Sequence, residues 1–277
     1  MRRVDRSWGG SSLLEFSVLA SGSSGNALYI RSNQTQILLD AGISGKQLQQ
    51  RLQQSTGVSL DGLDALLLTH EHIDHVRGLR QVIKQSRAQI YTTEGTWNQV
   101  GTPVEPDLKG REVHTVKAGQ AFSVGNILVT PFAVSHDAEE PVAYRFDSEG
   151  SSLTVATDLG YVSDSIKEVI AGCQSYVFES NHDVNMLRAG RYPWNIKRRI
   201  LGDKGHLSNI DAAIALADFL GTREVDVYLA HLSEENNQPD LAELTVSSVL
   251  REIKDSYGDQ VRLHRTGRHQ ATALHSL

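Results

Sequence analysis

The chain has 277 residues, of which 39% are hydrophobic and 22% charged, and its formal net charge is −6. A chain of this length buries about 75% of its unfolded surface without disulfides, and its near-average composition excludes a disordered or fibrous protein. Its one cysteine excludes a disulfide framework and a cysteine-rich zinc site, and fits a reducing cytosol. The acidic charge excludes a protein that coats nucleic acid with its whole surface.

No apolar run approaches the about 18 residues of a membrane-spanning helix, so we expect a cytoplasmic protein without a membrane partner. Three arginines near the start precede an apolar stretch that Glu15 interrupts, which is too short for a signal peptide. We therefore expect residues 1–12 to form a poorly ordered tail and residues 13–277 to form a single domain.

In chain order, the first third predicts three short strands rich in Val, Ile, Leu and Tyr, then a helix capped by Ser44 and a fully apolar strand. These elements span residues 16–20, 27–31, 36–39, 46–54 and 65–68. A helix beginning near Val76 and a strand over residues 89–92 follow.

The second half continues this alternation of strands and helices. Strands are predicted over residues 127–131, 142–146, 153–156, 176–179, 226–229 and 261–264, and helices over residues 163–171, 193–201, 210–220 and 241–256. Such an alternation predicts an α/β fold whose sheets are covered by helices.

Four side chains that bind metals gather in one short segment. Residues 69–75 (THEHIDH) directly follow the apolar strand and include His70, His72, Asp74 and His75. In an extended chain, residues two apart point the same way, so His70 and His72 can converge on one ion. Asp74 and His75 lie at the turn into the next helix and can face a second ion. Imidazole and carboxylate ligands suit zinc, manganese or iron.

Three further donors, His136, Asp158 and His231, each follow a short apolar run. This is the arrangement expected when a site lies at one edge of a sheet. A carboxylate such as Asp158 can bridge two ions, which an imidazole does poorly. Each residue alone would be an ordinary polar side chain, but their joint occurrence at strand ends predicts a metal site.

This donor set resembles the five-motif signature of the metallo-β-lactamase superfamily, and the resemblance extends from Phe16 to the C-terminus. It implies an αββα sandwich, in which helices flank two mixed β-sheets and two divalent ions, Zn²⁺ or Mn²⁺, lie at the sheet edges. The ligand sets that it implies are His70, His72 and His136 for one ion and Asp74, His75 and His231 for the other, with Asp158 between them.

Other segments are similar to the YycJ (WalJ) family, bacterial single-domain proteins associated with 5′→3′ exonuclease activity on DNA. These segments are residues 19–26 (LASGSSGN), 39–42 (LDAG), 157–160 (TDLG), 179–183 (ESNHD) and 205–209 (GHLSN). The chain differs from other branches of the superfamily. It has Asp158 where some lactamases have Cys and His72 where diiron reductases have Glu. The span from Asp158 to His231 is too short for the domain inserted in β-CASP nucleases.

The resemblance implies a phosphodiesterase, a 5′→3′ DNA exonuclease acting in repair, in which two ions activate a hydroxide oriented by Asp74. His206 lies in a motif similar to one of the RNase Z branch, and we expect it to be a general acid oriented by Glu179. The alternative is a purely structural role, in which His206 is a residue at a helix N-terminus and Glu179 is its salt-bridge partner. The loop with Ser23, Ser24 and Asn26 can bind phosphate through its backbone amides, or be only a hairpin turn.

A basic stretch over residues 188–204 precedes His206 and includes two aromatic residues. It offers phosphate contacts and stacking platforms for nucleic acid, although such a stretch can also be a solvated helix face. The residues expected to bind DNA are Arg191, Tyr192, Trp194, Lys197, Arg198 and Arg199.

Two other functions fit the same metal ligands. One is a small-molecule hydrolase of this fold, acting on a cyclic phosphodiester or on a thioester as glyoxalase II does. The other is a metal-binding regulatory or accessory protein without essential catalysis. The basic stretch favours the nuclease, and the sequence leaves the native metal and the oligomeric state open.

Overall fold

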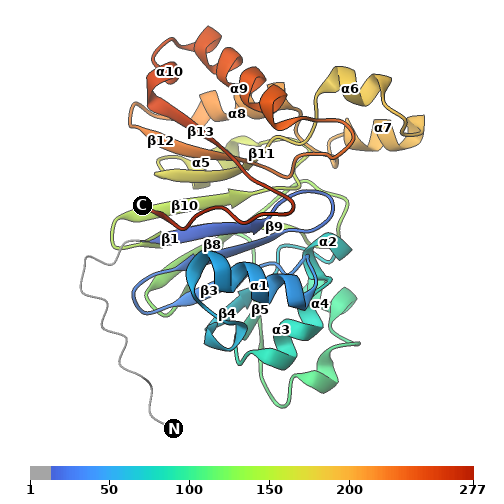
Figure 1. The fold of residues 1–277 in the computed structure, drawn as a ribbon, viewed down its shortest axis with the longest axis vertical. Helices are drawn as coiled ribbons and strands as arrows, with labels where there is room; N and C mark the ends of the chain where they lie inside the picture. Colours follow the sequence, from blue (N-terminus) through green and yellow to red (C-terminus); the bar gives the residue numbers. More distant parts are fainter. Residues whose placement is uncertain (1–13) are drawn as a thin grey trace.

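A computed structural model describes residues 14–277 of the chain, so the tail expected over residues 1–12 lies outside the described residues. Two seven-stranded sheets pack face to face, and helices cover their outer faces (Figure 1). The predicted αββα sandwich is confirmed. In the part of the chain that the structure describes, no helix is both long and apolar enough to cross a bilayer.

The first sheet is mixed, with the strand order β14-β1-β2-β3-β4-β5-β6. Pairing is antiparallel from β14 to β3 and parallel from β3 to β6. The strands are β1 (Glu15–Ala20), β2 (Ala27–Arg31), β3 (Gln36–Leu39), β4 (Ala65–Leu67), β5 (Gln89–Thr92), β6 (Val113–Thr115) and β14 (His275–Ser276). Two of these strands, β6 and β14, were not predicted.

The second sheet repeats this plan, with the order β13-β12-β11-β10-β9-β8-β7. Pairing is antiparallel from β7 to β10 and parallel from β10 to β13. The strands are β7 (Phe122–Val124), β8 (Ile127–Ala133), β9 (Val142–Ser148), β10 (Ser151–Ala156), β11 (Ser175–Glu179), β12 (Val225–Ala230) and β13 (Val261–Arg265). Only β7 was not predicted.

The helices connect the parallel strands and lie on the outside. They are α1 (Gly45–Thr56), α2 (Ile73–Val76), α3 (Leu79–Gln85), α4 (Glu94–Val100), α5 (Asp164–Ile170), α6 (Val184–Ala189), α7 (Trp194–Ile200), α8 (Asn209–Phe219), α9 (Pro239–Ile253) and α10 (Tyr257–Gln260), with short 3₁₀ turns at Leu60–Gly62 and Glu105–Asp107. Ser44 caps α1 in a reciprocal capping box with Gln47, as its side chain predicts.

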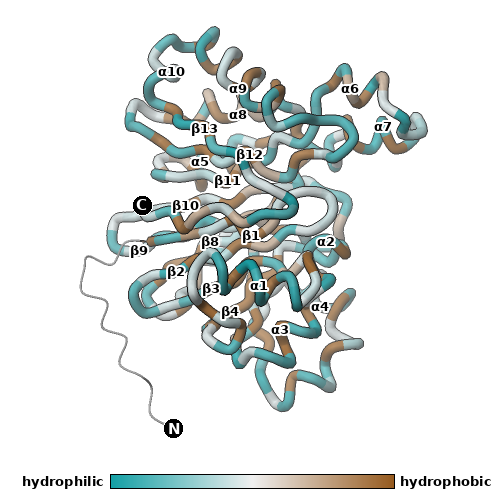
Figure 2. The backbone as a smooth tube through the Cα atoms, in the orientation of Figure 1, coloured by the Kyte–Doolittle hydropathy of each residue, from teal (hydrophilic) through white to brown (hydrophobic). Residues whose placement is uncertain are grey.

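Three apolar clusters hold the layers together. One lies between the two sheets and includes Phe16 and Tyr144. A second lies between the first sheet and helices α1 and α3, and a third between the second sheet and helices α5, α8 and α9. Because the strands are buried on both faces, they read as nearly continuous apolar runs. Figure 2 shows this contrast between the apolar strands and the polar helix α1.

Three residues at strand ends adopt left-handed backbone conformations. Asp40 after β3, Asp158 after β10 and His231 after β12 have φ values of 58°, 61° and 56°. Such values are uncommon for residues other than glycine and concentrate at functional sites. Each turn redirects the chain where a strand leaves its sheet, so polar side chains gather at this edge.

Candidate metal centre

His70, His72 and His136 form one group of facing imidazoles. The Nδ1 atom of His72 lies 3.1 Å from Nε2 of His70 and 3.2 Å from Nε2 of His136. His70 and His72 follow β4, whereas His136 follows β8, so the group joins the two sheets. One ring nitrogen from each residue lies within 4.8 Å of the others, close enough to hold one cation.

Asp74, His75 and His231 form a second group beside the first. The Oδ2 atom of Asp74 lies 3.7 Å from Nε2 of His75 and 3.6 Å from Nε2 of His231. These three residues also satisfy the 4.8 Å limit for a shared ion. The α2 turn carries the first two and the end of β12 carries the third, so this group also joins the two sheets.

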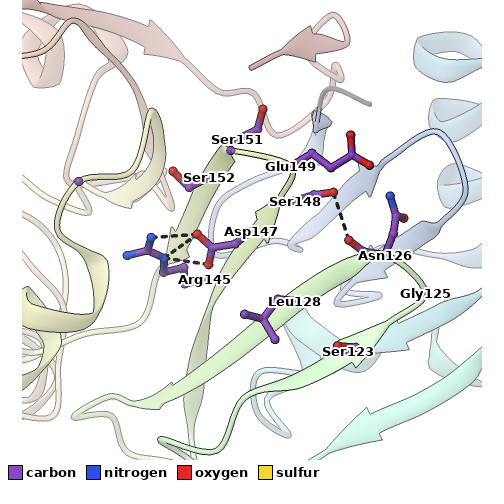
Figure 3. A pocket seen from close by; sticks show the side chains of 12 residues that line it. Ser123, Gly125, Asn126, Leu128, Arg145, Asp147, Ser148, Glu149, Ser151 and Ser152 are labelled. Carbon is purple, nitrogen blue, oxygen red and sulfur yellow. Dashed lines mark hydrogen bonds and ion pairs between the residues drawn. The ribbon is translucent and has the colours of Figure 1, made fainter. Parts of the chain in front are cut away.

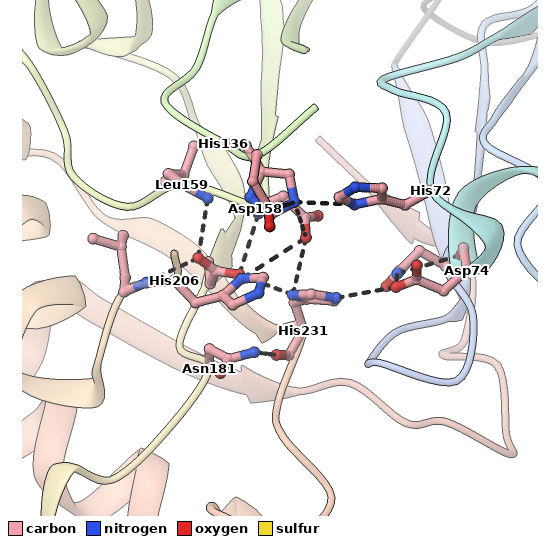
Figure 4. Close-up of polar contacts among 12 residues, drawn as sticks. His72, Asp74, His136, Asp158, Leu159, Asn181, His206 and His231 are labelled. Atoms are coloured by element: carbon pink, nitrogen blue, oxygen red, sulfur yellow. Dashed lines mark hydrogen bonds and ion pairs between the residues drawn. The ribbon is translucent and has the colours of Figure 1, made fainter. Parts of the chain in front are cut away.

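The carboxylate of Asp158 lies between the two groups (Figure 4). Its Oδ1 atom is 3.7 Å from Nε2 of His136 and 3.5 Å from Nδ1 of His231, and its Oδ2 atom is 3.3 Å from Nε2 of His75. It therefore approaches both groups, as expected of a carboxylate that bridges two ions.

The unsatisfied polar atoms of the cluster fit a cation. Oδ2 of Asp158 and Nε2 of His231 are buried and have no hydrogen-bond partner among the described residues, and the same holds for Nδ1 of His136. A buried polar atom without a partner is costly, and a divalent ion would satisfy both Asp158 and His231. Imidazoles and carboxylates are the donors that zinc and manganese accept.

Asp40, to which the sequence analysis assigned no role, orients the candidate ligand His75 through hydrogen bonds. Its carboxylate accepts hydrogen bonds from the backbone N–H of Thr69 at 2.9 Å and from Oγ1 of Thr69 at 2.8 Å. The same carboxylate lies 2.7 Å from Nδ1 of His75. An acceptor on Nδ1 fixes the tautomer that leaves Nε2 free to bind a metal. Its position after β3, like that of the other strand-end donors, is a signal that sequence reasoning could have used.

Glu179 and His206 lie together at the same edge, as expected. Nδ1 of His206 is 2.9 Å from Oε1 of Glu179, and Nδ1 of His231 is 2.8 Å from the same oxygen. Glu179 is fully buried and also accepts N–H bonds from Asp158, Leu159 and Leu207. The ring of His206 packs 5.2 Å from that of His136 and 5.2 Å from that of His231, between centroids, so it borders both groups.

Carboxylates dominate the electrostatics of this edge. Burial lowers the pKa of His231, but Asp158, Asp74 and Glu179 outweigh it and raise the pKa to about 10. Burial raises the pKa of Glu179, but His206 and His231 outweigh it and lower the pKa to about 2. The pKa of His206 is raised because the Glu179 carboxylate outweighs burial. The edge therefore stabilises positive charge.

The loop between β1 and β2 lies against the second group. Asn26 is buried, and its Nδ2 atom is 3.0 Å from Nε2 of His75 and 3.4 Å from Oδ2 of Asp74. Asn26 was expected to bind substrate, but its side chain is occupied in holding this loop to two of the candidate ligands. Ser23 is exposed and Ser24 half-buried.

The basic stretch forms α7 and the turn before it, which project on the side of the molecule where α2 also lies, at the right of Figure 1. Arg198, Arg199 and Trp194 are exposed there, and Arg199 lies 3.3 Å from Asp137, next to the first histidine group. Arg191 is also exposed, and Tyr192 is half-buried.

Lys197 departs from the expectation that it contacts substrate. It is buried, and its ammonium donates to the backbone carbonyls of Arg188 and Gly190, each at 2.7 Å. Because both carbonyls lie at the end of α6, Lys197 joins α6 to α7. The exposed cations on α7 are Arg198 and Arg199, and Arg199 donates to Asp137.

A polar hollow of about 540 Å³ lies away from these residues (Figure 3). Ser151 and Ser152 line it at the opposite end of β10 from Asp158. Its one arginine, Arg145, is bound to Asp147 and to the carbonyl of Val169. The hollow contains none of the predicted site residues, so we assign the chemistry to the histidine-rich edge.

Comparison with known proteins agrees with this arrangement. Residues 35–231 match the model of the Beta-lactamase superfamily domain. Together with the two sheets and the donor set at their edge, this match defines a metal-dependent hydrolase. The chain is 44% identical to the exodeoxyribonuclease YycJ of Bacillus anthracis, over 91% of this chain and 95% of that protein. It is 38% identical to the exodeoxyribonuclease WalJ of Streptococcus pneumoniae, over 94% and 97% of the two chains. The chain therefore belongs to the YycJ (WalJ) family of the metallo-β-lactamase superfamily.

Solved structures show the same fold at low sequence identity. The metallo-β-lactamase fold protein YhfI of Bacillus subtilis superposes with a TM-score of 0.70 at 17% identity, over 95% of this chain and 99% of that one. Zn²⁺-bound PqqB of Methylobacterium extorquens superposes with a TM-score of 0.67 at 20% identity, over 93% and 99%. These likenesses support the fold alone.

Proposed function

We propose that this protein is a cytoplasmic 5′→3′ DNA exonuclease, formed by residues 13–277 as one domain, whose catalysis depends on two divalent ions. The observation that carries the proposal is the pair of donor groups on either side of Asp158. His70, His72 and His136 would hold one ion, and Asp74, His75 and His231 would hold the other. Relatives in this family are named exodeoxyribonucleases, and these names support DNA as the substrate.

Two divalent ions held by these residues would supply Lewis acidity toward the scissile phosphate and would lower the pKa of water to near 7. Asp74 lies at the edge of its group and is partly exposed, with a side-chain exposure of 18%. It can therefore accept a hydrogen bond from the attacking water and orient that water toward phosphorus. Asp40 keeps His75 in the tautomer that binds through Nε2.

His206 donates the proton that the leaving oxygen needs. Because Glu179 engages Nδ1 of His206, Nε2 is the nitrogen that can reach a substrate oxygen. The Glu179 carboxylate favours the protonated ring, which is the form a general acid requires. The His206 ring borders both donor groups, which supports its assignment as the proton donor to a phosphate bound at this edge.

The DNA strand reaches this edge past α7. Arg198 and Arg199 bind backbone phosphates, and Trp194 and Tyr192 offer faces for base stacking. The distance of 3.3 Å between Arg199 and Asp137, the residue after His136, brings this surface to the rim of the metal centre.

Cleavage of end-labelled DNA tests the proposal. Single-stranded and duplex substrates carrying a 5′-phosphate or a 5′-hydroxyl are incubated with Mn²⁺, Zn²⁺ or Mg²⁺. We expect metal-dependent release of nucleotides from the 5′ end, abolished in His70→Ala and retained in His269→Ala, which alters an exposed histidine. A protein shown to hold metal that releases nothing from any of these substrates would refute the nuclease.

A further inference from the structure

The loop over residues 22–25 lies beside the second donor group, because the residues that flank it, Ser21 and Asn26, are both hydrogen-bonded to that group. The Oγ atom of Ser21 accepts the backbone N–H of His231 at 2.7 Å. At the other end, the backbone N–H of Asn26 donates to the carbonyl of Asp74 at 2.7 Å. The loop is therefore held at a fixed place beside Asp74 and His231.

The backbone of this loop offers two unused donors. The N–H of Gly22 binds Oδ1 of Asn26, and the N–H of Gly25 binds the carbonyl of Gly22. The N–H groups of Ser23 and Ser24, in contrast, have no partner among residues 14–277. Gly25 must be glycine because its φ is 155° and a Cβ there would lie 2.5 Å from the carbonyl oxygen of Gly42.

Two arginines flank the loop. Nη1 of Arg77 donates to the carbonyl of Ser24 at 3.1 Å. On the other side, Nη2 of Arg268 donates to the carbonyl of Leu232 at 3.0 Å, and its Nε would lie 3.1 Å from a Cβ built on Gly22. The C-terminal segment that follows β13 brings Arg268 to this place, 243 positions after Gly25 in the chain.

Neither Arg77 nor Arg268 has an ion-pair partner among residues 14–277. Within the described part of the chain, no carboxylate lies within 4.0 Å of either guanidinium, although Arg80, Arg145 and Arg265 each have such a partner. The Nε atom of Arg268 is also buried and has no hydrogen-bond partner among the described residues. Leaving a buried donor of a charged group unpaired costs free energy, which a bound anion would recover.

We infer that residues 22–25, Arg77 and Arg268 form a subsite for a phosphate group of the substrate. This inference rests on the proposed function and deepens it. Guanidinium groups and free backbone N–H groups are the donors that bind phosphate most strongly. The subsite borders Asp74 and His231, whereas Arg199 of α7 borders the other donor group. The subsite and Arg199 therefore bind phosphates of a nucleic-acid strand on opposite sides of the bond that is cut.

Binding of a short ligand that resists cleavage tests the subsite. The probes are the phosphorothioate-linked dinucleotide of two dT residues with a 5′-phosphate and the same compound with a 5′-hydroxyl, titrated calorimetrically into the metal-loaded protein. The variants are Arg268→Gln and Arg77→Gln, with Arg223→Gln as a matched control. Arg223 is exposed and precedes β12, at the opposite end of that strand from His231.

We expect Arg268→Gln and Arg77→Gln each to weaken binding of the phosphorylated probe about tenfold, and Arg223→Gln to change it less than twofold. If only the phosphorylated probe is affected, the subsite binds a terminal phosphate; if both probes are affected equally, it binds an internal one. If Arg268→Gln and Arg77→Gln both bind the two probes as tightly as Arg223→Gln does, the subsite is refuted.

Arg77 is exposed, so its variant keeps the test valid if Arg268→Gln fails to fold. The binding measurement needs no turnover. A wild-type protein that binds the probes in an arginine-dependent manner but cuts no DNA would therefore refute the exonuclease while supporting the phosphate subsite.

Discussion

The buried carboxylate of Glu179 lies 2.9 Å from Nδ1 of His206. The same oxygen lies 2.8 Å from Nδ1 of His231, so one carboxylate orients both the proposed proton donor and a proposed metal ligand. Three backbone N–H donors fix it in place, and no lysine or arginine among residues 14–277 forms an ion pair with it. This arrangement links the proton transfer to the metal centre through a single buried group.

Replacing Glu179 by glutamine should move the pH profile of the enzyme. Glu179 raises the pKa of His206, and the protonated donor is lost as the pH rises through that pKa. In Glu179→Gln the pKa of His206 falls, so the alkaline limb of kcat/KM should shift to lower pH. Asp40→Asn is the control, because Asp40 touches the ligand His75 but has no contact with His206 among the described residues. An alkaline limb that stays in place at equal metal content would contradict the role of Glu179.

Asp40→Asn should weaken metal binding. The amide cannot hold Nδ1 of His75 as the carboxylate does, and removing such a supporting group typically costs about 10–100-fold in metal affinity. Zinc affinity measured by competition with a chelating dye tests this, with the exposed Asp61→Asn as control. Equal affinities in Asp40→Asn and wild type would show that Asp40 serves the fold alone.

The double variant Arg198→Ala/Arg199→Ala should lower both the affinity for DNA and the steepness with which that affinity falls as salt concentration rises. Removing one cation that binds a phosphate of single-stranded DNA reduces the slope of log K against log salt concentration by about 0.7, so a decrease of about 1.4 is expected. Lys197→Met should instead lower the melting temperature, because Lys197 ties α6 to α7. Anisotropy titrations at several salt concentrations and thermal melts distinguish the two effects. A slope unchanged in the double variant would remove α7 from the DNA path.

Acid should weaken an ion pair at the far end of β12. Burial raises the pKa of Asp226, but hydrogen bonds from Arg262 and His264 outweigh it, so the pKa lies below its usual range. This carboxylate therefore stabilises the folded protein above the unfolded-state pKa of about 3.9, and the contribution is lost as the pH falls through the folded-state pKa. The free energy of unfolding is measured with denaturant, in the presence of a chelator that keeps both proteins free of metal. Asp226→Asn should have a lower free energy of unfolding than wild type at pH 7, and this difference should shrink below pH 4. A difference independent of pH would contradict this account.

The sequence predicted the strands that lead into the metal centre because they are buried on both faces and read as apolar runs. It predicted the donors because each follows such a run at the same sheet edge. The short edge strands β6, β7 and β14 were missed, since they contain polar residues such as His114, Ser123 and His275. The strand β14 also pairs with β1, at the other end of the described chain.

The surroundings of the donors depend on tertiary contacts that spacing does not encode. Lys197 lies in a run of cations, and only the packing of α6 on α7 shows that it is buried. Arg268 reaches the metal edge because the C-terminal segment returns to β1, where the backbone N–H of Thr272 donates to the carbonyl of Val18. Such long-range returns leave no periodic signal in the chain.

Metal titration tests the central claim most directly. Metal-free protein is titrated with Mn²⁺ while bound metal and cleavage of 5′-labelled DNA are measured on the same samples. The account predicts two ions per chain, with cleavage appearing as the second ion binds. It also predicts one retained ion and no cleavage in either His72→Ala or His231→Ala, which alter different donor groups. Full cleavage with one ion or none would contradict a catalytic centre built from both groups.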